Sequence, residues 1–235
     1  MTDERIFYVD PENIRDNSFI LDKSESIHAI NVLRLNVNDK IILIDGSGKS
    51  YLGIITIIQS NIVEGTISNF IDGFGENKIT INIAPSIIKR NRFEIMIEKA
   101  TELGVKKIEP LIMQRSMRKM INMDRCEKII LSAAKQCKRS SLPVLCKPVK
   151  FIPWMEKFNG QCVAGNQSSD VNLKNLDLDT NNAIQIIIGP EGDYSQDEIN
   201  VMGKSNVKFF TLGERRLRAE TAMMSSISIL NEILN

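Results

Sequence analysis

Apolar and polar positions follow different periods in the two parts of this chain of 235 residues. Residues 40–70 form three β-rich runs. Residues 45–48 lie between the first two runs and residues 60–61 between the last two, and both segments are typical of hairpin turns. Before them, residues 23–35 carry apolar side chains at helical spacing. The pattern predicts a small, mostly antiparallel domain over residues 1–72.

A linker with two glycines, residues 72–75, precedes a second part in which strand and helix patterns alternate. Gly104 suits the position after a helix, and Ser195 with Glu198 forms a capping box that predicts a helix start. Such alternation is typical of a mostly parallel sheet that helices cover on both faces. We therefore predict an α/β domain over residues 76–235, with strands at 78–85, 106–113, 161–165, 183–189 and 207–213 and helices at 90–103, 123–138 and 220–234.

The composition argues against several classes of function. No segment is long and apolar enough to span a bilayer, and the acidic N-terminus is no signal peptide, so we expect a cytoplasmic protein. The four cysteines lack C-x-x-C spacing and His28 is the single histidine, so we expect reduced thiols and no metal site. Gly48-Lys49-Ser50 matches the end of a P-loop, but the earlier glycine is missing and a strand pattern follows, which argues against ATP binding.

Basic charge gathers in one segment, although the net charge of the chain is only +1. Residues 86–150 contain 16 lysines and arginines against 6 acidic residues. Such a concentration is typical of proteins that bind a polyanion, and it is equally compatible with two solvated helix faces. The composition alone leaves both interpretations open.

Small and turn-forming residues follow three of the predicted strands. They are Ala164-Gly165-Asn166, Gly189-Pro190-Glu191-Gly192 and Leu212-Gly213. In open α/β sheets ligands bind beyond the carboxyl ends of the strands, and glycine lets the backbone approach a ligand closely. The dinucleotide fingerprint G-x-G-x-x-G is absent, as is the glycine-rich start of a Rossmann methyltransferase. Glycine also serves plain turn geometry, so these strand ends by themselves are weak evidence of a site.

The stretch LGERRLRAETA, which begins at Leu212, adds unusual chemistry to the last strand end. Arg215, Arg216 and Arg218 flank the apolar Leu217. An apolar residue among charges indicates a loop with one buried side, which could pack on a flat apolar ligand such as adenine. The alternative for the arginines is a solvated loop. The alternative for Glu220 is a carboxylate that stabilises the first turn of the next helix through the helix dipole. The residues alone therefore predict a nucleotide-like ligand beside a basic surface.

Five ordered segments carry a resemblance to a known family. IIGPEGDYSQDEI together with TLGERRLRAETAMMSSISIL resembles the paired C-terminal motifs of the bacterial 16S ribosomal RNA uridine-N3 methyltransferases, which belong to the SPOUT class. SIHAINVLRLNVNDKIILIDGSG is similar to the N-terminal, PUA-like RNA-binding domain of that family, and KATELGVKKIEPLIMQRS and ILSAAKQCKRSSLPVL resemble its middle segments. The resemblance spans nearly the whole chain in the right order.

The resemblance implies an architecture and an activity. The fold would be a PUA-like β-barrel at residues 1–72 and a SPOUT domain with a trefoil knot at residues 76–235. The activity would be methylation of N3 of a specific uridine in 16S ribosomal RNA of the small subunit. S-adenosylmethionine would lie bent in the knot, with its adenine near Ile188, Leu212 and Leu217. The full set of residues expected at the cofactor is Ala164, Gly165, Ile188, Gly189, Glu191, Gly192, Leu212, Gly213, Leu217 and Arg218.

Further roles follow from the chemistry of uridine N3, whose proton must leave before the methyl group arrives. We hypothesise that Arg218 or Arg215 stabilises charge that develops on a uracil oxygen. Glu220 or Glu191 could act as the base, and structural roles in a helix start and a turn are at least as plausible. Substrate RNA should contact the basic segment and the N-terminal domain, with the candidates Arg34, Lys89, Arg92, Arg115, Arg118 and Arg139.

The final helix also predicts a homodimer, because apolar residues surround much of it and related enzymes pair through this region. The sequence departs from the family pattern at Lys138 and Asp193, where glycine is common, and at Arg216, where an aliphatic residue is common. Two other functions stay open. One is a SPOUT enzyme that acts on another RNA or on ribose, which the T-E-L-G-V segment disfavours. The other is a non-catalytic RNA-binding or ribosome assembly factor.

Overall fold

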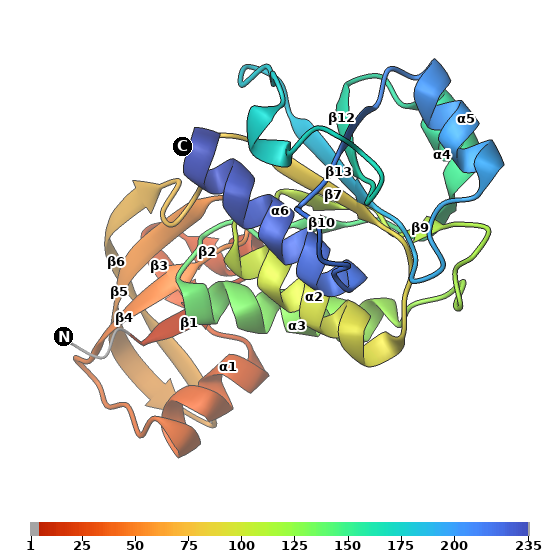
Figure 1. Cartoon of the computed structure of the whole chain (residues 1–235). Helices are drawn as coiled ribbons and strands as arrows, with labels where there is room; N and C mark the ends of the chain where they lie inside the picture. Colours follow the sequence, from red (N-terminus) through yellow and green to blue (C-terminus); the bar gives the residue numbers. More distant parts are fainter. Residues whose placement is uncertain (1–4, 235) are drawn as a thin grey trace. The chain divides into compact units, whose positions relative to one another are not determined.

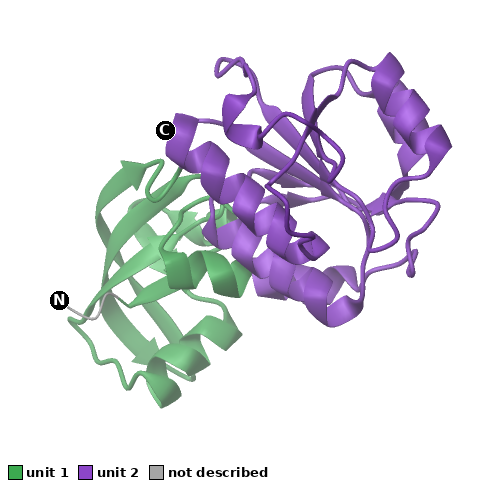
Figure 2. Ribbon diagram, viewed as in Figure 1, with its two compact units in different colours: residues 1–76, 131–142 green, residues 77–130, 143–235 purple. Residues whose placement is uncertain are grey.

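The computed structural model describes residues 5–234 of the chain. The chain divides into two compact units, unit 1 with residues 1–76 and 131–142 and unit 2 with residues 77–130 and 143–235 (Figure 2). The boundary after residue 130 falls inside helix α3 (Met123–Cys137). The sequence pattern carries no sign of this division, because the helical period continues through it.

Unit 1 is built on a sheet of six strands in the order β1-β4-β5-β6-β3-β2 (Figure 1). The β1–β4 pair is parallel and every other pair is antiparallel, which confirms the prediction of a mostly antiparallel domain. The turns between β4, β5 and β6 lie where the sequence predicts them. The strands are β1 (Ile6–Tyr8), β2 (Ile14–Arg15), β3 (Ser18–Ile20), β4 (Lys40–Ile44), β5 (Lys49–Gln59) and β6 (Ile62–Asp72).

The core of unit 1 packs aromatic and branched side chains against this sheet. Phe7, Phe19 and Leu43 are fully buried there. Gly65 is required for this packing, since a Cβ at this position would lie 2.5 Å from the ring of Phe19 and 2.2 Å from a backbone oxygen. A short 3₁₀ turn covers Pro11–Asn13.

The predicted helix at residues 23–35 forms in a modified way. Asp22 caps α1 (Lys23–Ile27) by accepting a hydrogen bond from the backbone N of Glu25 at 2.8 Å. The chain then continues as a π-helical segment, His28–Val32. His28 is half-buried with its ring edge against Phe7, at 6.1 Å between ring centroids. The single histidine therefore packs against an aromatic side chain of the core of unit 1.

Unit 2 contains a six-stranded sheet in the order β10-β8-β7-β13-β12-β14, in which all pairs are parallel. The predicted parallel sheet is therefore confirmed. Because the strands are parallel, their carboxyl ends all lie at one edge. The strands are β7 (Ile81–Pro85), β8 (Lys107–Ile108), β10 (Val144–Leu145), β12 (Gln161–Gly165), β13 (Ile184–Ile188) and β14 (Lys208–Phe210).

Helices cover both faces of this sheet, as the continuous apolar run Ile186-Ile187-Ile188 predicts (Figure 1). On one face, Ala164 and Ile187 belong to a core that includes side chains of two helices, α4 (Phe151–Lys157) and α5 (Gln196–Lys204). The alternate residues point to the opposite face, where α2 (Arg90–Glu102) packs against α6 (Ala219–Leu234). A 3₁₀ turn, η3, covers Leu173–Asn175.

The predicted strand at 106–113 is wrong as a single strand. Its first part is β8 in the large sheet, and its second part, β9 (Leu111–Ile112), pairs with β11 (Val149–Lys150) in a separate two-stranded sheet. Pro110 separates the two parts, and a proline has no N–H with which to continue a ladder. The strand predicted at 207–213 is shorter than expected, since β14 ends at Phe210.

Two turn positions explain features of the sequence. Gly104 follows α2 with φ +86°, as a residue in the C′ position does, and a Cβ there would lie 2.2 Å from the side chain of Asn77. Lys138 follows α3 with φ +63°, a conformation that suits glycine. The lysine therefore adopts a backbone conformation that suits glycine, at a position where the resemblance leads us to expect glycine.

Candidate cofactor pocket

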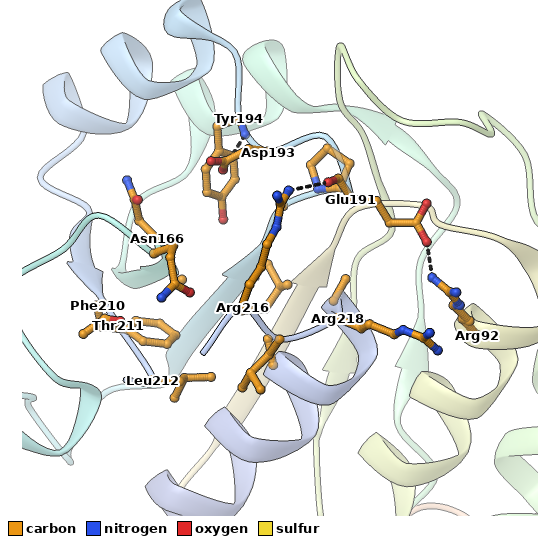
Figure 3. A pocket seen from close by; sticks show the side chains of 18 residues that line it. Arg92, Asn166, Glu191, Asp193, Tyr194, Phe210, Thr211, Leu212, Arg216 and Arg218 are labelled. Carbon is orange, nitrogen blue, oxygen red and sulfur yellow. Dashed lines mark hydrogen bonds and ion pairs between the residues drawn. The ribbon is translucent and has the colours of Figure 1, made fainter. Parts of the chain in front are cut away.

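A cavity of about 610 Å³ opens at the carboxyl ends of the adjacent strands β12, β13 and β14 (Figure 3). Sites for small ligands occupy roughly 300–1,000 Å³. Three strand-end loops, the start of α6 and one residue of α2 form the walls. The lining residues are Arg92, Gly165, Asn166, Gln167, Ile188, Gly189, Pro190, Glu191, Asp193, Tyr194, Phe210, Thr211, Leu212, Arg216, Leu217, Arg218, Ala219 and Ala222.

Tyr194 anchors the loop that follows β13. Its buried hydroxyl donates to the backbone oxygen of Ile187 at 3.3 Å, and burial raises its pKa well above the usual value. The phenol is therefore neutral and serves packing. A Cβ at Gly189 would lie 3.0 Å from the tyrosine ring, so glycine lets the chain pass over it. The capping box of Ser195 and Glu198 then starts α5, as predicted.

Asp193 occupies a position where the resemblance leads us to expect glycine, and its backbone conformation is one that suits glycine. Its φ is +66°, and its carboxylate accepts a hydrogen bond from the backbone N of Tyr194 at 2.8 Å. Aspartate tolerates the left-handed region better than most residues, because its short side chain bonds locally. The turn therefore forms with aspartate in the position that follows Gly192.

Hydrogen bonds tie the three loops together around the cavity. Gln167, from the loop after β12, donates through Nε2 to the backbone oxygens of Gly213 at 2.9 Å and Glu214 at 3.1 Å. Arg216 donates to the backbone oxygen of Glu191 at 3.1 Å, and its side chain runs across the cavity (Figure 3). Each loop thus holds the position of another.

One wall of the cavity is apolar. It is lined by Ile188 and Phe210 at the ends of β13 and β14 and by Leu212 and Leu217 in the loop after β14. Gly165 keeps the end of β12 narrow, since a Cβ there would lie 2.7 Å from the Cδ1 atom of Ile188. Apolar side chains next to the backbone of strand-end loops suit a flat heterocycle that carries hydrogen-bonding edges.

One side of the cavity is charged. Arg92, from α2, forms an ion pair with the carboxylate of Glu191. The Nε atom of Arg92 also lies 3.6 Å from Oε1 of Glu220 in the first turn of α6. The other oxygen of Glu220, Oε2, is buried without a hydrogen-bond partner. Arg218 extends from the last loop toward the same side (Figure 3).

Most residues predicted at a cofactor meet in this cavity. The lining includes Gly165, Ile188, Gly189, Glu191, Leu212, Leu217 and Arg218. Ala164 is buried within β12, and Gly192 and Gly213 lie in the loops but outside the lining. A Cβ at Gly192 would contact the side chain of Arg115 at 3.4 Å.

The predicted catalytic residues separate by position. Both arginines are exposed, but only Arg218 lines the cavity, and Arg215 lies outside the lining. Glu220 is 8% exposed and lies next to the lining residue Ala219. The geometry therefore distinguishes the two arginines, which the sequence alone leaves equivalent.

The residues predicted to bind RNA occupy different environments. Arg34, Lys89 and Arg118 are exposed, as a phosphate contact requires. Arg115 is exposed but donates to the backbone oxygens of Gly192 at 2.7 Å and Tyr194 at 3.2 Å, so it supports the pocket loop. Arg92 lines the cavity.

The prediction for Arg139 is wrong. This residue is 1% exposed, and its guanidinium donates to both carboxylate oxygens of Glu76, at 3.0 and 2.9 Å. A buried bidentate pair inside unit 1 leaves the arginine inaccessible to RNA. Local charge density does not distinguish a surface cation from a buried partner of a carboxylate.

Several lining residues are absent from the predicted set. Gln167 and Thr211 lie within two residues of predicted strand ends, and the same strand-end rule could have included them. For Arg92 the sequence holds no such signal, because it lies 99 positions before the glutamate with which it pairs.

No group of three or more potential metal ligands occurs in residues 5–234. The four cysteines are free thiols. Burial raises the pKa of the Cys162 thiol to about 12. Within the same described range, no helix is long and apolar enough to cross a membrane.

Two families match successive parts of the chain. Residues 75–231 match the family described as RNA methyltransferase domain, and residues 21–68 match the family described as RNA methyltransferase PUA domain. Ribosomal RNA small subunit methyltransferase E 2 of Borreliella burgdorferi is 30% identical over 95% of each chain. The chain belongs to the ribosomal RNA small subunit methyltransferase E family.

Other members of this family agree in sequence and structure. The Rickettsia conorii member is 29% identical, over 94% of this chain and 92% of its own. The Neisseria gonorrhoeae member, solved bound to S-adenosyl methionine, superimposes with a TM-score of 0.89 at 26% identity over 98% of both chains. A Legionella pneumophila methyltransferase in complex with the same cofactor gives 0.86 at 26% identity over 97% of both chains.

Proposed function

We propose that this protein transfers a methyl group from S-adenosylmethionine to N3 of a uridine in 16S ribosomal RNA of the small subunit. The observation that carries the proposal is the cavity between three strand-end loops in a chain of this methyltransferase family. Its ribosomal substrate would make the activity cytoplasmic. RNA is read through unpaired bases, so the target uridine must be open or splayed out, at the expense of a few kcal/mol.

The residues of the cavity fit the proposed cofactor. The volume of about 610 Å³ suits a nucleoside with an amino-acid tail, and the apolar wall of Ile188, Leu212 and Leu217 suits adenine. S-adenosylmethionine supplies an electrophilic methyl group on a sulfonium centre. The close packing at Gly165 and Gly189 keeps two of the loop backbones free of side chains that would fill the space.

We assign Arg218 the role of stabilising negative charge on a uracil oxygen as N3 loses its proton. Arg218 lines the cavity and Arg215 does not, which favours the first of the two sequence candidates. Glu191, at the cavity wall, and Glu220, behind it, are the candidate acceptors for the proton. The loops would hold the base in line with the methyl group, and such positioning supplies much of the rate.

We further propose that residues 1–72 form the RNA-binding domain and residues 76–235 the catalytic domain. Exposed cations at Arg34, Lys89 and Arg118 are the preferred phosphate contacts. Because residues 131–142 belong to unit 1, cofactor binding is best measured on the full chain.

The finer architecture is also a proposal. We infer that unit 1 closes as a β-barrel and that the strand-end loops of unit 2 form a trefoil knot. Their mutual hydrogen bonds, from Gln167 to Gly213 and from Arg216 to Glu191, support the second inference. Single-molecule extension of the chain should stop short of its full contour length, and full extension would contradict a knot.

A homodimer through α6 is the proposed assembly. Ile233 is 42% exposed, and Ile229, one turn before it on the same face, is half-buried, so apolar surface remains on this helix. Light scattering should give a mass twice that of one chain for the wild type and a mass of one chain for Ile233→Asp. Ile227 is fully buried within its own chain, so a substitution there would test folding instead of assembly.

The activity is tested by incubating the protein with labelled S-adenosylmethionine and either naked 16S RNA or assembled small subunits, and then mapping the methylated atom. We expect label at N3 of one uridine. Label on ribose or on another RNA would replace the proposed substrate, and cofactor binding without transfer would indicate a non-catalytic factor.

The assignment of Arg218 is tested by comparing Arg218→Ala with Arg215→Ala. Loss of an electrostatic donor lowers kcat by about 100-fold or more, so we expect this loss only for Arg218→Ala. Equal turnover in the two variants would remove Arg218 from the mechanism.

A further inference from the structure

The N-terminus of α2 breaks a rule of helix electrostatics. Lys89 is its N-cap residue and Arg90 and Arg92 lie in the first turn, which contains no acidic residue. No side chain caps the free N–H groups. Positive charge is unfavourable at this end of a helix, where the dipole is itself positive. Sequences tend to break such local rules where function requires it.

The two arginines of this turn are compensated in different ways. Arg90 donates to Glu94 at 2.7 Å within the same helix, and its side chain is 54% exposed. Arg92 has its carboxylate partners elsewhere in unit 2, Glu191 after β13 and Glu220 in α6. Only Arg92 of the pair lines the cavity.

Glu220 depends on this arginine. Its side chain is 11% exposed, and Arg92 lies 3.6 Å from Oε1 while Oε2 has no hydrogen-bond partner. A carboxylate in such a position loses most of its hydration, and removal of a paired cation leaves an uncompensated buried charge. Without Arg92, the carboxylates of Glu191 and Glu220 would both lose the cation that they contact.

We propose that Arg92 is a positioning residue for methyl transfer, which fixes Glu191 at the cavity wall and neutralises Glu220 behind it. The inference rests on the proposed function and adds a residue to its machinery. It replaces the role that charge alone suggests for Arg92, a contact with an RNA phosphate. Because Arg92 acts through the carboxylates, its replacement should lower turnover and should change the affinity for RNA little.

The experiment compares Arg92→Ala and Arg92→Lys with the matched control Arg90→Ala, which removes a cation from the same helical turn. Turnover is measured at saturating RNA and cofactor, with the KM for RNA and its salt dependence measured in parallel. Arg92→Ala should lower kcat at least about tenfold and change the KM less than about twofold. Arg92→Lys should recover part of kcat, and Arg90→Ala should match the wild type.

The double variant Arg92→Ala/Glu191→Gln separates positioning from general damage to the fold. If Arg92 acts through Glu191, the double variant should be no slower than the slower single variant, because residues that act as a unit are not additive. Multiplied losses would overturn the proposal. So would an increased KM with a flatter salt dependence at unchanged kcat, which would make Arg92 a phosphate contact.

Activity measurements on the wild-type enzyme distinguish a failure of the positioning role of Arg92 from a failure of the proposed function. If it methylates N3 and the Arg92 variants behave as phosphate contacts, only the positioning role fails. If the wild type does not methylate uridine at N3, the proposed function itself fails.

Discussion

Two arginine–glutamate pairs show how differently one kind of interaction serves the two units. In unit 1, Arg139 and Glu76 have side chains 1% and 8% exposed, and two hydrogen bonds join them. In unit 2, Arg92 and Glu191 are 29% and 30% exposed and lie at a cavity. The same residue types thus form a buried structural contact in one unit and part of a site wall in the other.

The difference lies in which polar atoms are satisfied. Glu76 also accepts a hydrogen bond from the backbone N of Ser141 at 3.0 Å, so the buried pair is part of a local network. Beside Arg92, by contrast, Oε2 of Glu220 is buried without a partner. Satisfied buried groups specify a fold, whereas an unsatisfied one next to a cavity is a candidate for a functional group.

The largest effect that separates the pairs should be on stability. Arg139→Ala removes one partner of a buried ion pair and should lower the free energy of unfolding by about 3–5 kcal/mol. The control Arg34→Ala, an exposed arginine in the same unit, should change it by less than about 0.5 kcal/mol. Urea unfolding followed by circular dichroism measures both, and similar midpoints for the two variants would contradict a structural role for Arg139.

The next effect concerns the cavity. Gly165→Val should weaken S-adenosylmethionine binding by about tenfold or more, since overpacking against Ile188 costs about 1–3 kcal/mol. Gly203→Val is the matched control, because a Cβ at Gly203 meets no atom within 4 Å. Titration calorimetry on the full chain compares them. Unchanged affinity for Gly165→Val would mean that the cofactor binds elsewhere.

A smaller effect should distinguish surface cations from both ion pairs. Arg118→Ala should reduce the slope of log K for RNA against log salt by about one, since one phosphate contact is lost. Arg92→Ala should leave the slope unchanged. Binding titrations at several salt concentrations give the slopes. If the slope stays the same in Arg118→Ala, Arg118 does not contact an RNA phosphate.

The smallest effect concerns an ion pair near the surface of unit 2. Hydrogen bonds from Arg125 and then Arg90 lower the pKa of Glu94 from 4.5 to about 2. A lowered pKa contributes stability above the unfolded value, and this contribution is lost as pH falls toward 2. Between about pH 5 and pH 2.5 the wild type should therefore lose more stability than Glu94→Gln. Parallel pH curves from thermal melts would exclude a contribution from Glu94.

Local patterns determined much of the architecture. The hairpins of residues 40–70, the capping box at Ser195 and the C′ glycine at Gly104 depend on neighbours in sequence, and all three form as predicted. The strand-end glycines at Gly165 and Gly189 were identified as candidates because parallel strands bring their carboxyl ends together.

Other features needed the tertiary structure. The split at Pro110 depends on which sheet each half joins, and the assignment of residues 131–142 to unit 1 depends on packing along α3. Buried Arg139 and cavity-lining Arg92 carry the same local signal, a cation in a basic segment.

The sequence by itself determined the alternation of strands and helices and the family. It also determined that three loops follow strands whose carboxyl ends lie at one edge of a sheet. Only the tertiary structure decided which charges meet. Hydrophobic periodicity and turn chemistry act over a few residues, so they can be recognised in the sequence. An ion pair such as that of Arg92 with Glu191 joins side chains 99 positions apart, and its partners are set by how the helices pack on the sheet.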